Sequence, residues 1–285
     1  MMLKPFDPWK NSLCTCPSKL SLNPYTGCSH GCLYCYASSY IPRFSECRPK
    51  RDLLKQLERD ISKAAPGTLI TLSGSTDPYQ PAEKELGITS GCLKILRSGC
   101  MAVQVVTKSD MVCEDIDLLS GMRSVVNITV TTLKDSLSRR LEPAAPLPGR
   151  RLQAIRKLRD NGIPVSVRVD PIIPGINDSE IKDIVSEVCS AGAQHITSST
   201  YKARPDSMKR LCTAFPAEGV ALKALFKRGE RIGGSLYLPE ELRLRIMHEI
   251  EVYAAIKGMS FACCREGLRK QRKVSCDGSH LIQSI

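Results

Sequence analysis

Three cysteines near the start of the chain have the types and spacing that could do metal chemistry. Cys28, Cys32 and Cys35 lie in the stretch Asn-Pro-Tyr-Thr-Gly-Cys-Ser-His-Gly-Cys-Leu-Tyr-Cys-Tyr-Ala, residues 23–37. Thiolates are the usual ligands of iron–sulfur clusters, and a [4Fe–4S] cluster usually takes four of them. Three cysteines leave one iron without a protein ligand, and an open coordination position is typical of a catalytic metal site. The spacing therefore predicts a [4Fe–4S] cluster with one open iron.

Two other interpretations of these cysteines are a zinc site and buried structural thiols. Zinc sites usually show two paired Cys-x2-Cys or His units and close at four ligands. His30 could be a fourth ligand, but it lies between two of the cysteines, where tetrahedral ligation would strain the loop. Structural thiols would not need Gly27 and Gly31, which let a loop wrap closely around a bulky ligand. The cluster is the preferred interpretation.

The cysteine motif resembles the signature of the radical S-adenosylmethionine (SAM) enzymes, and the longer stretch is similar to the branch that includes spore photoproduct lyase. The resemblance implies that SAM fills the open iron position and that an electron from the cluster cleaves it to a 5′-deoxyadenosyl radical, which abstracts hydrogen from a substrate. It also implies a reductant such as ferredoxin or flavodoxin. Within the motif, Tyr34 is a candidate cofactor-binding residue.

Length and composition are those of a cytosolic protein with one sizeable core. The chain has 285 residues, no apolar run of the ~20 residues that a membrane span needs, and no signal-peptide core at its first residues. We therefore expect a cytoplasmic protein without a membrane partner. Fourteen cysteines in such a chain indicate metal chemistry rather than a disulfide framework.

The chain is strongly basic, which favours a nucleic-acid partner. Its formal net charge is +12, and such an excess commonly accompanies polyanion binding. A generally basic, solvated surface is the alternative. A local cluster near the C-terminus strengthens the first interpretation: Arg265, Arg269, Lys270, Arg272 and Lys273.

Strands and helices alternate along the first 200 residues. Compact β-rich runs predict six strands, at residues 20–23, 68–73, 101–107, 124–131, 163–169 and 194–199. Helical spacing of apolar residues predicts helices between them, such as 51–64 and 150–161, and another over 239–257. This order indicates parallel βαβ units, and it resembles the partial (β/α)6 TIM-type barrel of radical SAM enzymes. We expect an α/β barrel at residues 1–200 and a mainly helical C-terminal extension, 201–285, covering the barrel mouth.

In a parallel barrel the catalytic residues gather at the carboxyl ends of the strands. The second strand leads to Ser75 and Asp77, which the resemblance makes SAM-binding candidates; an Asp-Pro turn is the alternative for Asp77. The third strand ends at Lys108, which could neutralise the methionine carboxylate. The fourth ends at Thr131, which could contact the ribose, together with Glu142.

Several charged residues near the strand ends have a structural interpretation as well as a functional one. Glu142, which follows the fourth strand, could form a solvated pair with Arg140. In the fifth strand, Arg168 is a candidate second anchor for the SAM carboxylate, and an Arg168–Asp170 structural pair is the alternative. His195 in the sixth strand is interpreted as a satisfied core histidine.

The C-terminal segment carries a second group of cysteines. In spore photoproduct lyase a cysteine returns a hydrogen atom to the product radical, and the position aligned with it here is Gly74. The motifs Cys-Arg-Glu-Gly and Cys-Asp-Gly-Ser-His make Cys264 and Cys276 catalytic candidates for that role. Alternatively, Cys14 or Cys16 could join them in binding an auxiliary iron–sulfur cluster or zinc. A tail with incidental thiols is the third possibility.

These observations lead to three functional hypotheses. The first is a radical SAM enzyme that modifies or repairs nucleic acid. The second is a radical SAM enzyme acting on a peptide or small metabolite. The third is a non-catalytic iron–sulfur or zinc protein that binds nucleic acid.

Overall fold

The computed structural model of the protein describes residues 2–6, 13–267 and 274–282. Within these residues one sheet contains eight strands in the order β1-β2-β5-β6-β7-β8-β9-β12. β1 is antiparallel to β2, and every other neighbouring pair is parallel. The strands are β1 (Lys4–Pro5), β2 (Leu20–Leu22), β5 (Leu69–Leu72), β6 (Ala102–Thr107), β7 (Ser124–Thr129), β8 (Val165–Ile172), β9 (His195–Thr200) and β12 (Ser260–Cys263).

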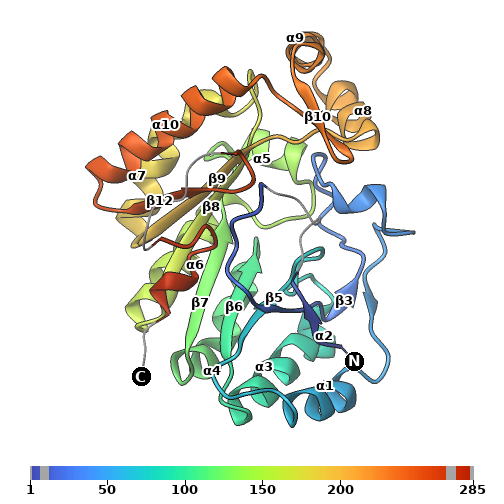
Figure 1. Cartoon of the computed structure of the whole chain (residues 1–285), viewed down its shortest axis with the longest axis vertical. Coiled ribbons are helices and arrows are strands. Elements are labelled where there is room, and N and C mark those ends of the chain that lie inside the picture. Colours follow the sequence, from blue (N-terminus) through green and yellow to red (C-terminus); the bar gives the residue numbers. More distant parts are fainter. Residues whose placement is uncertain (1, 7–12, 268–273, 283–285) are drawn as a thin grey trace.

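Helices connect the parallel strands, as in repeated βαβ units (Figure 1). They are α1 (Leu53–Ile61), α2 (Glu83–Leu86), α3 (Ile88–Ser98), α4 (Ile116–Ser120), α5 (Asp135–Leu141), α6 (Pro148–Asp160) and α7 (Ile181–Ala191). The C-terminal part adds α8 (Pro205–Ala214), α9 (Pro216–Lys227) and α10 (Glu240–Ile256). Two small hairpins complete the structure: β3 (Tyr25–Thr26) with β4 (Arg48–Pro49), and β10 (Glu230–Ile232) with β11 (Ser235–Tyr237).

The predicted α/β fold with parallel strands separated by helices is confirmed, and all six predicted strands belong to the main sheet. Two details differ from the sequence prediction. The predicted strand over 124–131 ends at Thr129, whereas the predicted strand over 163–169 continues to Ile172. The C-terminal segment also supplies β12, which pairs with β9 and extends the parallel set.

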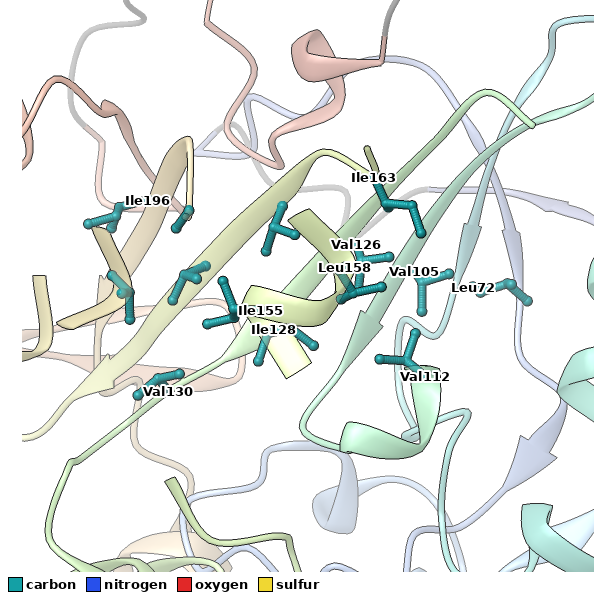
Figure 2. Close-up of a cluster of buried hydrophobic side chains, with 14 of the residues drawn as sticks. Leu72, Val105, Val112, Val126, Ile128, Val130, Ile155, Leu158, Ile163 and Ile196 are labelled. Carbon is teal, nitrogen blue, oxygen red and sulfur yellow. The ribbon is translucent and has the colours of Figure 1, made fainter. Parts of the chain in front are cut away.

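Each central strand has one apolar face and one polar face. Val105, Val126 and Ile128 point to the same side and pack against the helices (Figure 2). The alternate positions carry buried polar side chains, which face the inside of the barrel. Those nearest the middle of the strands are Thr71, Gln104, Asn127, Ser166 and Thr197. The apolar layer forms the core, and the polar layer leaves the inside of the barrel available for ligands.

The polar residues on the inner face form hydrogen bonds with the C-terminal segment of the chain. The Asp277 carbonyl oxygen accepts hydrogen bonds from the side chains of Gln104 (2.6 Å) and Asn127 (2.8 Å). Gly278, at φ +76°, lies so close to Ser166 that a Cβ would be 2.6 Å from the serine Cβ. Residues 275–281 therefore fill the barrel at the amino ends of the strands, which we call the closed end. No helix within the described part of the chain is both long and apolar enough to span a lipid bilayer.

Candidate active site

A cavity of about 310 Å³ lies at the carboxyl ends of the parallel strands, which we call the mouth. Its wall combines the cysteine loop, the turns after β5, β6 and β9, and the segment around Cys264. It extends inward along the polar face of the sheet as far as Gln104 and Asp277. Ligand pockets typically measure roughly 300–1,000 Å³, so the cavity is large enough for a small cofactor or substrate group.

The structure brings Cys28, Cys32 and Cys35 together in one cavity wall. The loop that carries them passes through Gly27 at φ +80°, where a Cβ would lie 2.0 Å from the Glu46 carbonyl oxygen. Only glycine fits at this position. The loop is further held by a hydrogen bond from the Cys28 amide to the Phe44 carbonyl (2.6 Å).

The three thiols suit an iron–sulfur cluster by their chemistry and placement. Burial raises the pKa of the Cys28 thiol to about 11, and it also raises the pKa values of Cys32 and Cys35. Such thiols become thiolates when a metal takes the place of the proton. Within the ranges that the structure describes, no three Cys, His, Asp or Glu side chains gather closely enough to hold a single metal ion. A [4Fe–4S] cluster instead binds each thiolate to a different iron, so the donor set fits a cluster.

A buried network of charged side chains holds Tyr34 of the cysteine loop in place. The Tyr34 hydroxyl donates to the Glu142 carboxylate, whose other oxygen lies 2.5 Å from Arg151 Nη2. The Lys108 ammonium lies 5.6 Å from the centre of the Tyr34 ring. Burial alone would raise the pKa of Glu142, but Arg151 and Lys108 outweigh it and lower that pKa to about 2. Glu142 is therefore a carboxylate at neutral pH.

This network differs from the local pair that the sequence suggested. Arg140 does not pair with Glu142; its guanidinium donates to the Ala214 carbonyl oxygen (2.6 Å). Glu142 is fully buried, so its partner is the equally buried Arg151 on α6 rather than a solvated neighbour. The partner of Glu142 is therefore set by the packing of the folded chain and not by proximity in sequence.

Asp77 and Ser75 both line the cavity, but the Asp77 carboxylate is occupied by the protein. One oxygen accepts from the Tyr79 amide (2.9 Å) and the Thr107 hydroxyl (2.6 Å), and the other accepts from the Lys108 amide (2.7 Å). The Tyr79 bond is the Asx turn that an Asp-Pro sequence favours. Asp77 thus connects the turn after β5 to the end of β6 and fixes the backbone position of Lys108.

Arg168 and Asp170 point into the cavity from β8 and form an ion pair. Asp170 also accepts a hydrogen bond from the Ser199 hydroxyl (2.6 Å). The Arg168 guanidinium lies beside the Cys264 thiol. Burial raises the pKa of Cys264, and Arg168 opposes that shift without reversing it. The pair predicted as an alternative is therefore present, and it forms part of the cavity wall.

Two predicted site residues lie apart from the others. Thr131 is buried outside the cavity lining, where its carbonyl oxygen accepts from the Asn177 side chain (2.8 Å). Cys276 is also outside the lining; its sulfur lies behind Cys16, at 3.3 Å from the Cys16 sulfur. His195 is fully buried, and its Nδ1 lies 2.9 Å from the Ser260 hydroxyl.

Several cavity residues were missed by the sequence interpretation. The Tyr36 hydroxyl donates to the Gly74 carbonyl oxygen (2.7 Å), and Lys202 Nζ lies 2.8 Å from Glu266. Glu266 is fully buried and also accepts from the Thr200 amide (2.7 Å), so it fastens the Cys-Arg-Glu-Gly segment to the end of β9. The alternation of polar and apolar residues in the strands was the signal that could have identified the inner face.

Most of the basic C-terminal cluster cannot be placed at the cavity. Arg269, Lys270, Arg272 and Lys273 lie outside the described residues. Arg265 lies in the cavity wall, where its guanidinium donates to the Tyr237 hydroxyl (2.9 Å).

Comparisons with known proteins identify the family of the chain. The family model described as "Radical SAM superfamily" matches residues 22–188, more than half of the chain. The chain is 31% identical over 170 residues to Uncharacterized protein MJ0683 of Methanocaldococcus jannaschii, a match covering 57% of this chain and 64% of that protein. It is 24% identical over 254 residues to a protein of Pseudomonas phage M6 named "Radical SAM Nalpha-GlyT isomerase", covering 85% of this chain and 53% of that one.

Among solved structures, the chain is similar to a spore photoproduct lyase mutant with bound AdoMet and dinucleoside spore photoproduct. The TM-score is 0.69 at 15% identity, and the match covers 85% of this chain and 75% of that chain. At this identity the likeness shows a shared fold. It confirms the predicted partial barrel.

Proposed function

The chain belongs to the radical SAM superfamily, and on that premise we propose that it binds a [4Fe–4S] cluster and SAM in the cavity and modifies or repairs a nucleic acid. The observation that carries the proposal is the cavity itself, because Cys28, Cys32 and Cys35 share its wall with polar residues from five strand ends. When bound, the cluster and SAM supply a 5′-deoxyadenosyl radical that abstracts a hydrogen atom from the substrate.

The cavity residues have separate tasks in this proposal. Cys28, Cys32 and Cys35 would hold the cluster. Lys108 and Arg168 carry the positive charge that a SAM carboxylate requires, and Ser75 offers polar groups to its amino acid part. Since Arg168 is already paired with Asp170, Lys108 is the stronger carboxylate partner. Tyr34 is held by Glu142, so it would orient Lys108 through its ring rather than bind the cofactor through its hydroxyl.

We assign the return of a hydrogen atom to the substrate radical to Cys264. It lines the cavity, whereas Cys276 does not, and its raised pKa keeps it in the thiol form that carries a hydrogen atom. In that step the S–H bond breaks, a C–H bond forms on the substrate, and a thiyl radical remains. One electron and one proton, from a reductant such as ferredoxin or flavodoxin, would restore the thiol.

A nucleic acid is proposed as substrate from the charge and aromatic groups near the mouth. Six basic side chains but only three acidic ones line the cavity. Two half-exposed tyrosines, Tyr36 and Tyr40, stack with ring centres 6.2 Å apart. Basic grooves that carry exposed aromatic rings are typical of proteins that bind unpaired bases. The similar solved structure holds a dinucleoside spore photoproduct, which supports the same substrate class here.

The test is anaerobic reconstitution with iron and sulfide, followed by incubation with SAM and dithionite. We expect about four iron atoms per chain and the release of 5′-deoxyadenosine. Replacing Cys28, Cys32 or Cys35 with alanine should abolish both, whereas Cys113→Ala, outside the cavity wall, should leave both unchanged. A colourless protein that binds zinc and releases no 5′-deoxyadenosine would contradict the proposal.

Cys264→Ala separates the hydrogen-return step from cofactor binding. This variant should still bind iron and release 5′-deoxyadenosine, but it should lose most of the product formed from an oligonucleotide substrate. Wild-type product yield from the variant would exclude Cys264 as the donor. Activity on peptides or small metabolites, with no binding of oligonucleotides, would replace the substrate proposal.

A further inference from the structure

Three cysteines outside the cluster motif meet near the inner end of the cavity. Cys14 and Cys16 belong to the segment before β2, and Cys276 belongs to the segment that fills the closed end. The sulfur atoms of Cys16 and Cys276 are 3.3 Å apart, so no other atom lies between them. Cys16 lines the cavity, whereas Cys276 is only 5% exposed. One thiol of the pair can therefore meet a small molecule in the cavity, and the other is shielded behind it.

The contacts around the two sulfurs fix them in this position. Lys19 and Asp277 form a buried ion pair next to them, and Lys19 also donates to Gln104 (2.9 Å). The Thr197 hydroxyl donates to the Cys276 carbonyl oxygen (2.8 Å). Both chain ends are thereby anchored to the inner face of the sheet, and the two thiols are held in contact rather than brought together by chance motion.

We propose that Cys16 and Cys276 form a thiol–disulfide exchange site, which small-molecule disulfides such as oxidised glutathione convert reversibly to an intramolecular disulfide. The site is separate from the cluster cysteines and does not depend on the proposed function. Its product would link the segment before β2 covalently to the C-terminal segment across the closed end of the barrel.

The exchange takes place in two balanced steps. The Cys16 sulfur, which faces the cavity, attacks one sulfur of oxidised glutathione; an S–S bond forms, the glutathione S–S bond breaks, and one glutathione leaves. The Cys276 sulfur then attacks the Cys16 sulfur and expels the second glutathione. The two thiol protons end on the two glutathione molecules, so the protein dithiol is oxidised and the small disulfide is reduced.

The local electrostatics act differently on the two steps. Hydrogen bonds to Cys14 and Cys276, together with burial, raise the pKa of Cys16, so the first step is the slower one. The hydrogen bond with Cys16 lowers the pKa of Cys276 in the dithiol and is lost in the mixed disulfide, whereas Thr15 and Lys19, which also lower it, stay in place. The attacking species in thiol–disulfide exchange is the thiolate. Cys276 is therefore suited to resolve a mixed disulfide at Cys16, even though its burial keeps it from meeting glutathione directly.

The test uses the reconstituted holoprotein, in which Cys28, Cys32 and Cys35 are occupied as ligands. Under anaerobic conditions it is equilibrated with mixtures of reduced and oxidised glutathione, alkylated, digested with trypsin and mapped by mass spectrometry. We expect the peptide that contains Cys14 and Cys16 to be linked to the peptide that contains Cys276, with the loss of two hydrogens. Dithiothreitol should reverse the linkage.

Serine variants assign the partners. Cys14→Ser should retain the link, whereas Cys16→Ser and Cys276→Ser should each lose it. The proposal is overturned if the folded wild-type protein forms no link at high oxidised glutathione, or if the link persists in Cys16→Ser. It is also overturned if both thiols resist alkylation because they hold additional iron or zinc. Mapping of the wild-type protein decides the question even if a serine variant does not fold.

Discussion

At the scale of single residues, Glu142 is the side chain whose surroundings most constrain the site. It is fully buried, it is held as a carboxylate by Arg151, and it fixes the Tyr34 hydroxyl inside the cysteine motif. The backbone reinforces the same junction, since the Leu33 amide donates to the Leu141 carbonyl (2.9 Å). The position of the cysteine loop thus depends on a charge pair that lies far from it in sequence.

Glu142→Gln should therefore weaken both the fold and the cluster site. The substitution leaves Arg151 buried without a counter-charge, a change that typically costs about 3–5 kcal/mol. Chemical unfolding should show this loss, and the variant should retain less iron after reconstitution. Glu46→Gln, at an exposed pair with Arg43, is the control and should cost less than about 1 kcal/mol. Equal stability of the two variants would contradict the assigned role of Glu142.

The sequence could identify the cysteine ligands but not this support. Cys28, Cys32 and Cys35 are close in sequence and their residue type limits the chemistry, so the motif alone predicts a metal site. Glu142 and Arg151 become partners only through the packing of α6 against the sheet. The sequence predicts that the fourth strand ends at Thr131, but β7 ends at Thr129, and Thr131 lies beyond the cavity wall.

His195 makes the stability of the protein depend on pH. Burial and the neighbouring His280 together lower its pKa to about 3, although Asp277 acts in the opposite direction. In the unfolded chain a histidine has a pKa of about 6.5. Below that pH the unfolded state therefore binds a proton that the native state does not bind. The stabilisation is complete above about pH 6.5 and is lost as pH falls towards the native pKa, by at most about 1.4 kcal/mol per pH unit.

Unfolding free energies measured between pH 7 and pH 4 test this expectation. His195→Asn should flatten the decline, whereas His248→Asn, on the exposed side of α10, should leave the profile unchanged. The same slope in all three proteins would show that other groups cause the acid sensitivity.

At the scale of elements, the C-terminal segment closes the barrel that the strands leave open. β12 extends the sheet beside β9, and residues 275–281 fill the closed end. Strands and helices of the barrel could be predicted because each follows a local period of apolar residues. The closing segment has no such period, and its position depends on polar side chains from strands more than a hundred residues away, which a local pattern does not reveal.

Gly278→Ala should dislodge this segment. The residue has φ +76°, and a Cβ would lie 2.6 Å from the Ser166 Cβ, so backbone strain and overlap add up. We expect a loss of about 2–5 kcal/mol in the free energy of unfolding. Gly233→Ala is the matched control, because Gly233 has a similar φ of +59° with no atom within 4 Å; strain alone should cost about 1–2 kcal/mol. Equal losses would show that the contact with Ser166 does not constrain the segment.

At the scale of the whole molecule, the basic charge and the cavity together make a prediction about ligands. The formal net charge is +12, but a net charge alone does not distinguish a binding surface from a solvated one. The cavity wall is itself rich in basic side chains, including Arg204 next to α8 at the mouth. In Figure 1, α8 lies at the opposite end of the molecule from α1. Basic residues beside α8 are therefore near the mouth, and basic residues on α1 are far from it.

Binding of a short single-stranded oligonucleotide should therefore weaken steeply with salt. If about four phosphates are contacted, the logarithm of the association constant should fall with the logarithm of salt concentration with a slope of about −3. Arg204→Gln should make that slope shallower by about 0.7, the share of one contact on a single strand. Lys55→Gln on α1, which is exposed and far from the mouth, should leave the slope unchanged. Fluorescence anisotropy at several salt concentrations measures each value. Equal slopes in both variants would place the basic contacts elsewhere, and no binding at low salt would end the nucleic-acid proposal while leaving the radical chemistry of the site untouched.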